Sequence, residues 1–205
     1  FVTATFIMKI VFVSSYIPRK CGIATYTRDL AEELIKQGHT VEIVEMKNAV
    51  TSDQQNELVT KRIEQNTKSE YIKAARELNL GDSDIVHIQH EFGLFGGTDG
   101  KYILEMAALL KKPVFVTFHT ILETPTVNQK YIIQELGRVS RGSIVMEEIA
   151  KDRLIQKYGF NEWTISVILH GVPDIGNVNR NDVRKKLKLD KSFTLLISNL
   201  ISRNK

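Results

Sequence analysis

Cysteine is the scarcest reactive residue in this chain of 205 residues, because Cys21 is the only one. One thiol excludes an intramolecular disulfide, so a hydrophobic core has to stabilise the fold. The chain is long enough to bury such a core. Its 42% hydrophobic and 25% charged residues are typical of globular proteins, which excludes disordered and fibrous classes. This cysteine usage suits a reducing compartment, and we expect a cytoplasmic protein.

Long apolar runs are also missing. None reaches the roughly 18 to 20 residues that a membrane-spanning helix needs. The N-terminal stretch FVTATFIMKIVFVSS is apolar, but it lacks a leading basic region and carries Lys9 in its middle, which argues against a signal peptide. Since MKIVFVSS reads like a natural beginning, we interpret residues 1–7 as upstream or non-native sequence and leave them out of the fold.

Several catalytic motifs are absent as well. The first strand is not followed by G-x-G-x-x-G, which disfavours a dinucleotide-binding site, and GGTDGK lacks the spacing of a phosphate-binding P-loop. The sequence has no H-E-x-x-H, no Cys/His cluster with metal-ligand spacing and no G-x-S-x-G turn. We therefore expect no metal ion and no bound cofactor.

Short β-branched runs alternate with segments of helical period along most of the chain. That alternation predicts an α/β fold, with a Rossmann-like parallel sheet and helices on both faces. The predicted strands are residues 9–14, 39–46, 83–89, 113–118, 142–146 and 164–169, and the predicted helices are 23–37, 69–80, 102–112, 128–139 and 147–159. Gly38 is placed to end the first helix, and residues 47–66 read as a polar, exposed excursion.

The C-terminal tail differs from this pattern. We divide the chain into a domain at 8–178 and a tail at 179–205, in which a basic helix at 180–189 precedes a strand at 192–200. That strand reads as the opening of a second, truncated domain. Much of the net charge of +4 lies in this tail. A solvated helix face explains it best, an anionic membrane surface comes second, and nucleic acid is disfavoured because no aromatic residues interleave.

Histidines gather where predicted strands end. His90, His119 and His170 each follow an apolar strand run, whereas His39 precedes a strand and His87 lies inside one. Ligands of open parallel sheets bind beyond the carboxyl ends of the strands, so position favours ligand contact for His119 over a structural role. His90 and His170 stay open between a contact and a turn.

Two further features share this edge. Glu91, directly after His90, is either a salt-bridge partner or an acceptor for a hydroxyl group. In PRKCGIATYTRD, Gly22 begins a helix whose first amides attract phosphate or carboxylate, and Arg19 and Lys20 add positive charge. An ordinary helix start explains Gly22 almost equally well. His87 and His90 are three residues apart in a strand, so their side chains should face opposite sides.

Five stretches, in this order and spacing, resemble the N-terminal half of retaining glycosyltransferases of family 4, which have the two-domain GT-B fold. They are SSYIPRKCGIATYTRDLAEEL, DIVHIQHEFGLFGG, KPVFVTFHT, SIVM and VILHGVPD. The resemblance implies two Rossmann-like domains, of which the N-terminal one holds the acceptor. It places Gly22 near the donor diphosphate, His119 beside the transferred sugar, and Lys205 as a diphosphate-contacting lysine. Asn199 stands about where many members have an arginine.

The resemblance implies an enzyme that transfers a hexosyl group from a nucleoside diphosphate sugar, with retention, to a carbohydrate or lipid-linked acceptor. The residues expected to contact the acceptor are Arg19, Lys20, Tyr26, His90, Glu91 and His170. The isolated chain should be inactive, because the family's nucleotide-binding residues and paired glutamates belong to the other domain. Two alternatives stay open: a nucleotide-sugar epimerase of the same architecture, and a non-catalytic glycan- or partner-binding module that self-associates through the strand at 192–200.

Overall fold

The computed structural model describes residues 6–48, 56–172, 176–189 and 193–195. The chain divides into two compact units, residues 1–169 and residues 170–205, and each is described by itself. The first unit contains the complete sheet and five α-helices of the described chain. No helix among the described residues is both long and apolar enough to cross a bilayer.

A seven-stranded sheet forms the centre of the N-terminal unit, with strand order β3-β2-β1-β4-β5-β6-β7. Every neighbouring pair is parallel. The strands are β1 (Lys9–Ser14), β2 (Thr40–Lys47), β3 (Val59–Glu64), β4 (Ile85–His90), β5 (Val114–Phe118), β6 (Gly142–Val145) and β7 (Ile165–Val167). The order reverses at β1, which lies between β2 and β4 although it comes first in the chain.

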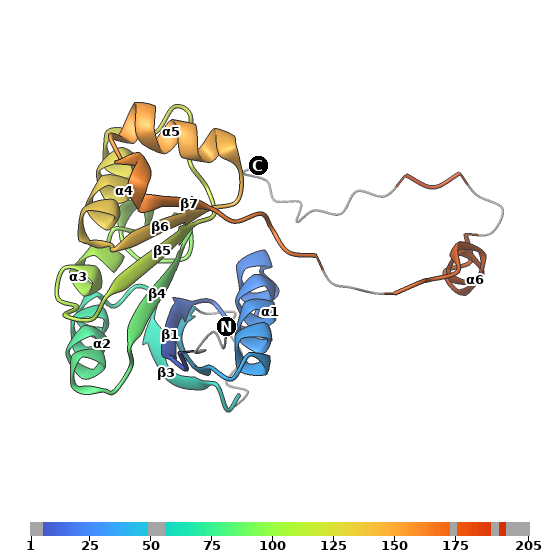
Figure 1. Cartoon of the computed structure of the whole chain (residues 1–205), viewed down its shortest axis with the longest axis horizontal. Helices are drawn as coiled ribbons and strands as arrows, with labels where there is room; N and C mark the ends of the chain where they lie inside the picture. Colours follow the sequence, from blue (N-terminus) through green and yellow to red (C-terminus); the bar gives the residue numbers. More distant parts are fainter. Residues whose placement is uncertain (1–5, 49–55, 173–175, 190–192, 196–205) are drawn as a thin grey trace, which may run out of the picture. The chain divides into compact units, whose positions relative to one another are not determined.

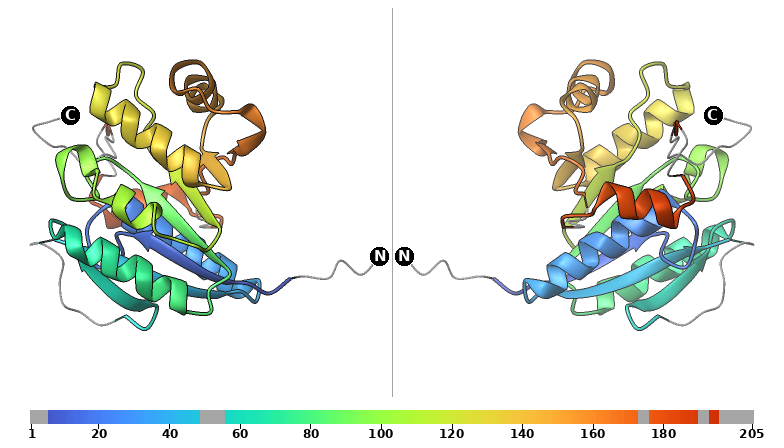
Figure 2. Two further views of the ribbon diagram at one scale, coloured as in Figure 1. Left: turned by 90° about the vertical axis from the view of Figure 1, so that its left-hand side faces the viewer. Right: turned by 90° about the vertical axis from the view of Figure 1, so that its right-hand side faces the viewer.

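Helices cover both faces of the sheet. They are α1 (Gly22–Lys36), α2 (Lys68–Leu80), α3 (Ile103–Ala107), α4 (Val127–Val139) and α5 (Glu148–Tyr158), with short 3-10 turns at Thr98–Gly100 and Glu162–Thr164. Figure 1 shows α1 on one side of the sheet and α2, α3 and α4 on the other. In the left view of Figure 2, α2, α3 and α4 lie in that order across one face. The predicted α/β fold with helices on both faces is confirmed.

Two hydrophobic clusters fill the space between sheet and helices, because alternate residues of each strand point to opposite faces. In β1, Val11 and Val13 belong to the larger cluster, which includes residues of α2, α3, α4 and α5. Ile10 and Phe12 belong to the smaller cluster with Ala31 of α1. Both sides of β1 are therefore buried, and this explains its continuous apolar sequence.

The first helix lies where its sequence predicts. Ala24, Thr27 and Ala31 are buried and share one side of α1, and their small side chains let the helix lie close to the sheet. The helix ends at Lys36, and Gly38 follows with φ +93°, a backbone conformation that favours glycine. The predicted role of Gly38 as a terminator is confirmed.

The expectation for residues 47–66 was wrong in part. Val59–Glu64 forms β3, an edge strand that pairs with β2, while residues 49–55 lie outside the described part of the chain. The polar sequence VTKRIE hides this strand because only Ile63 is fully buried. Its charges are used for pairing instead: Arg62 Nε donates to the buried Glu45 Oε2 of β2 at 2.8 Å.

The C-terminal unit contains one described helix, α6 (Arg180–Lys186). Asn179 caps it, since the side-chain oxygen of Asn179 accepts from the amides of Asn181 at 2.9 Å and Asp182 at 3.4 Å. No residue of α6 is buried. Of the strand predicted at 192–200, residues 193–195 are described and are not in a strand, and the rest lies outside the described residues.

Candidate functional site at the carboxyl edge of the sheet

The carboxyl ends of β1, β4 and β5 lie side by side because these strands are parallel neighbours. The loop of residues 15–21 follows β1, Glu91 follows β4 and His119 follows β5. The strand order reverses between β1 and β4, and sheets of this kind bind ligands where it reverses. The three segments singled out by the sequence therefore meet at one edge.

His119 is held at this edge by contacts to its backbone and its ring. Its amide donates to the carbonyl of His90 at 3.0 Å, which extends the ladder one residue beyond β5. Its Nε2 lies 2.8 Å from Oε1 of Gln89 in β4. The ring meets Tyr26 of α1 edge-on, with 5.0 Å between centroids and an angle of 90°. The fold thus brings Tyr26 and His119 together, and the side chain of His119 is only partly buried.

Glu91 accepts hydrogen bonds from the chain itself. The hydroxyl of Thr120 donates to Oε2 at 2.6 Å, and the amide of Phe92 donates to Oε1 at 3.1 Å. These bonds orient the carboxylate next to the residue that follows His119. Each carboxylate oxygen can accept more than one hydrogen bond, so this group can also take a hydroxyl from a ligand.

His90 faces the other side of the sheet. Its side chain is fully buried and packs against Phe92, Phe95 and Phe118, with ring centroids 5.1 to 6.1 Å apart. Neither ring nitrogen has a hydrogen-bond partner among the described residues. Burial lowers the pKa of His90 to about 3, with a smaller contribution from His119. This environment favours a packing role for His90 over contact with an acceptor.

His87 occupies the face opposite to His90, so the predicted opposition of the two rings is confirmed. Its ring packs against Phe12, and its Nε2 lies 2.8 Å from the hydroxyl of Thr117. Burial lowers the pKa of His87 to about 4, again with a smaller contribution from His119. Both histidines of β4 are therefore neutral at pH 7.

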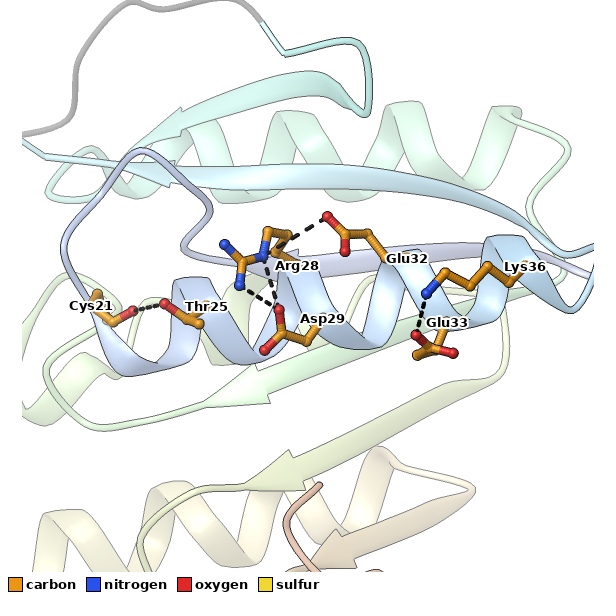
Figure 3. A network of polar contacts seen from close by, with 7 residues as sticks. All are labelled: Cys21, Thr25, Arg28, Asp29, Glu32, Glu33 and Lys36. Atoms are coloured by element: carbon orange, nitrogen blue, oxygen red, sulfur yellow. Dashed lines mark hydrogen bonds and ion pairs between the residues drawn. The ribbon is translucent and has the colours of Figure 1, made fainter. Parts of the chain in front are cut away.

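The N-terminus of α1 is open at Gly22. Cys21 precedes the helix without a side-chain cap, and the first turn has no acidic residue. The first helical bond runs from the amide of Thr25 to the carbonyl of Cys21, whose oxygen also accepts the Thr25 hydroxyl at 3.4 Å (Figure 3). The amides ahead of Thr25 have no acceptor within the helix. A Cβ on Gly22 would meet no atom within 4 Å, so a ligand has room to approach.

Charged side chains on α1 pair with one another. Arg28 pairs with Asp29 at 2.6 Å and with Glu32 at 3.9 Å, and Lys36 pairs with Glu33 at 2.6 Å (Figure 3). These pairs leave the backbone amides at the N-terminus of α1 without an acidic partner in the first turn, and that helix end carries a partial positive charge.

Arg19 and Lys20 lie in the loop before this helix. Nη1 of Arg19 donates to the carbonyl of Met46 at 3.3 Å, which holds the partly buried guanidinium at the end of β2. Lys20 is exposed. Both cations lie in the segment that links the end of β1 to the open amides of α1.

Two predicted residues do not lie in the unit that carries this edge. His170 is the first residue of the C-terminal unit, where it is exposed and Nδ1 donates to the carbonyl of Gly171 at 2.8 Å. Lys205 lies outside the described residues, as does Asn199. Their predicted roles stay predictions.

A hollow of about 350 Å³ lies elsewhere, between α3 and α4, and Leu104, Tyr131 and Arg138 contribute to its lining. Arg138 is paired with Glu135 at 2.9 Å, and no predicted site residue lines the hollow. Within the described ranges no group of three or more His, Cys, Asp or Glu side chains could hold a metal ion.

Sequence reasoning missed Gln89 and gave Thr120 no role of its own. Both are ordinary polar residues when read singly. The alternation of side chains along a strand could have pointed to Gln89. His87 and Gln89 are two residues apart in β4, so their side chains lie on the same face of the sheet. In the register of the sheet, Gln89 of β4 is paired with Thr117 of β5, and His119 follows Thr117 by two residues.

Comparison with known proteins gives a consistent picture. The model of the family described as Glycosyltransferase Family 4 matches residues 21–174. The alpha-monoglucosyldiacylglycerol synthase of Streptococcus pneumoniae is 29% identical and is matched over 95% of this chain and 49% of its own length.

Solved structures show the same fold at low sequence identity. A glycosyltransferase from Rickettsia africae superposes with a TM-score of 0.62 at 19% identity, over 90% of this chain and 50% of its own. Anabaena Alr3699/HepE, solved with UDP and glucose, gives a TM-score of 0.56 at 16% identity, over 89% of this chain and 51% of its own length. The chain thus spans about half the length of the proteins that it matches.

Proposed function

Because the chain belongs to glycosyltransferase family 4, we propose that it holds the acceptor in a two-domain enzyme that transfers a hexosyl group from a nucleoside diphosphate sugar with retention. The observation that carries this proposal is the convergence of His119, Glu91 and the open α1 amides at one sheet edge. Such an edge offers groups for a sugar and for a phosphate next to each other.

In this proposal the amides at Gly22 and the side chain of His119 contact the donor. Amides at a helix N-terminus stabilise the negative charge that grows on a departing diphosphate. His119, held between Gln89 and Tyr26, positions the transferred sugar. A cation at Lys205 would add to the diphosphate contacts. HepE was solved with UDP and glucose, so UDP-glucose is the first donor to test.

Glu91 is the main acceptor contact in this proposal, because its oriented carboxylate can accept a hydroxyl. Arg19, Lys20 and Tyr26 belong to segments that start at the same edge, and His170 of the C-terminal unit is a further proposed acceptor contact. His90, which was expected to contact the acceptor, is buried and packs against Phe118 of the neighbouring strand. The relative from Streptococcus pneumoniae is named alpha-monoglucosyldiacylglycerol synthase, which favours a lipid-linked acceptor. Peripheral membrane contact through basic residues of α6, such as Lys185 and Lys186, belongs to the same proposal.

The test is turnover by the protein that carries this chain together with a nucleotide-binding half. His119→Ala should lower UDP-glucose hydrolysis and transfer by about 10²-fold or more, since preorganised polar groups contribute on that scale. His39→Ala is the matched control, because His39 accepts a bond from the Met8 amide at the amino end of the sheet. Unchanged turnover in His119→Ala would remove this residue from the site. The anomeric configuration of the product tests retention.

The same assay separates the two alternatives. An epimerase would exchange a hydrogen at a sugar carbon in labelled water and would form no glycoside, whereas the family match favours transfer. A binding module would turn over no donor and would bind a glycan with the isolated chain. Self-association through residues 192–200 would then appear in gel filtration as a concentration-dependent dimer. The isolated chain should show no transfer under the main proposal.

A further inference from the structure

We propose that Gln89 is a positioning residue whose side-chain amide fixes the tautomer and the orientation of His119. The inference begins with the 2.8 Å contact between Gln89 Oε1 and His119 Nε2. A carbonyl oxygen can only accept, so the imidazole must donate from Nε2. In the neutral ring the lone pair then lies on Nδ1. The amide of Gln89 thereby selects one of the two neutral tautomers.

Two further contacts make this selection rigid. His119 donates its backbone amide to His90, the residue after Gln89, at 3.0 Å. Tyr26 meets the ring from the side at a right angle. Adjacent residues of β4 therefore hold the backbone and the ring of His119, while α1 limits its rotation. This is the arrangement by which supporting residues orient a histidine that contacts a ligand.

The burial of Gln89 argues against a merely structural role. Its side chain is fully buried, and Nε2 has no hydrogen-bond partner among the described residues. An unpaired buried amide donor is unfavourable, and an apolar side chain of similar size would avoid that cost. Glutamine at this position is therefore explained by its oxygen, which contacts His119, and not by packing.

The consequence for catalysis rests on the proposed function. A neutral His119 that donates from Nε2 has its lone pair on Nδ1. At Nδ1 it can therefore accept a hydrogen bond but cannot donate one. The ligand group that it meets through Nδ1 would be a donor, such as a sugar hydroxyl. Loss of Gln89 would let the ring rotate and populate both tautomers, which weakens this contact without removing the imidazole.

The primary experiment is nitrogen-15 NMR of the histidine rings in this chain without any donor or acceptor. The unsubstituted chain should show His119 as the Nε2–H tautomer. Gln89→Leu should give a mixture of tautomers, and Gln89→Glu should raise the pKa of His119 by about one unit or more, because a carboxylate favours the imidazolium. A pure Nδ1–H form in the unsubstituted chain, or an unchanged tautomer in Gln89→Leu, would overturn the proposal.

Thr117→Val is the matched control. It removes a buried side-chain hydrogen bond of the same 2.8 Å length, to His87, from the same pair of strands. Its His119 spectrum should match that of the unsubstituted chain. A tautomer change in this variant as large as that in Gln89→Leu would mean that any loss of a polar contact perturbs the ring, and the specific role of Gln89 would fail.

Stability and turnover complete the test. Gln89→Leu should unfold at the same denaturant concentration or a higher one, while transfer by the whole enzyme falls by about tenfold. Should Gln89→Leu fail to fold, Gln89→Glu keeps the proposal falsifiable through the pKa of His119. The NMR result does not depend on glycosyl transfer, so failure of the inference and failure of the proposed function can be told apart.

Discussion

His87 and His90 are both buried, and they lie three residues apart in β4. Their pKa values fall to about 4 and about 3, from an ordinary value of 6.5, mainly because burial disfavours the imidazolium. Between pH 6.5 and those values the unfolded chain binds protons that the folded chain does not. Stability is therefore complete above pH 6.5 and is lost as the pH falls.

We expect the free energy of unfolding to drop by about 2 kcal/mol for each of these histidines between pH 7 and pH 5, since one pKa unit corresponds to about 1.4 kcal/mol. His90→Leu should therefore lose about half as much stability as the unsubstituted chain over this range. Urea unfolding at the two pH values measures the difference. Equal losses in the two proteins would show that His90 is charged, or accessible to protons, in the folded state.

At the residue scale the sequence predicted position better than role. It placed His119 and Glu91 at the carboxyl edge, and it predicted that the His87 and His90 rings face opposite sides. It did not show that His90 lies among phenylalanines, because Phe118, in β5, is distant in the sequence from Phe92 and Phe95, which follow β4. Nor did it point to Gln89, whose importance depends on a contact 30 residues away.

Tyr71 contributes two hydrogen bonds at the glycine-rich turn after β4. Tyr71 of α2 donates its hydroxyl to the carbonyl of Gln65 at 2.7 Å and accepts the amide of Gly96 at 2.9 Å. The turn lies so close to Gln65 that a Cβ on Gly96 would be 1.9 Å from its carbonyl oxygen. Only glycine fits there, and the same turn continues back to Glu91.

Gly96→Ala should therefore lower the free energy of unfolding by about 1 to 3 kcal/mol, the usual cost of overpacking against atoms that cannot move away. Gly93→Ala, three residues earlier, is the matched control, because a Cβ there would meet no atom within 4 Å. Urea unfolding of both variants measures the effect. Similar stability of the two would mean that the turn can shift away from Gln65.

At the element scale, hydrophobic periodicity predicted the helices and strands that have an apolar face, and it missed β3, which has none. The sequence of β3 has no apolar run because several of its residues are charged, and one of them, Arg62, pairs with Glu45 of β2. The third predicted helix, residues 102–112, was too long, since α3 ends at Ala107. The side chain of Leu109 is 41% exposed, so the apolar residues that follow Ala107 do not all belong to a buried helical face.

For the whole molecule, the alternation of strand and helix was sufficient to predict the α/β class. The strand order needs contacts between distant residues, and local sequence does not contain them. The family resemblance added the expectation that Gly22 lies near the donor diphosphate and His119 beside the transferred sugar. The fold then determines that β1, β4 and β5 share the edge that carries the proposed site.

Protection from exchange should differ strongly across the chain. Amides of β1 and β4 lie in the buried centre of the sheet, whereas α6 has seven residues and buries none of them. In hydrogen exchange followed by mass spectrometry, peptides covering β1 and β4 should stay protected for hours and those covering α6 should exchange within seconds. Slow exchange of α6 in the isolated chain would indicate a packing partner for it.

The central place of β1 also affects synthesis on the ribosome. Of the strands in the sheet, β1 leaves the ribosome first, but one of its two partners, β4, ends only at His90. Until then one edge of an apolar strand is open, and open edges recruit other chains. Sheets built from such distant pairings form slowly. A nascent chain that ends before His90 should therefore depend on a chaperone.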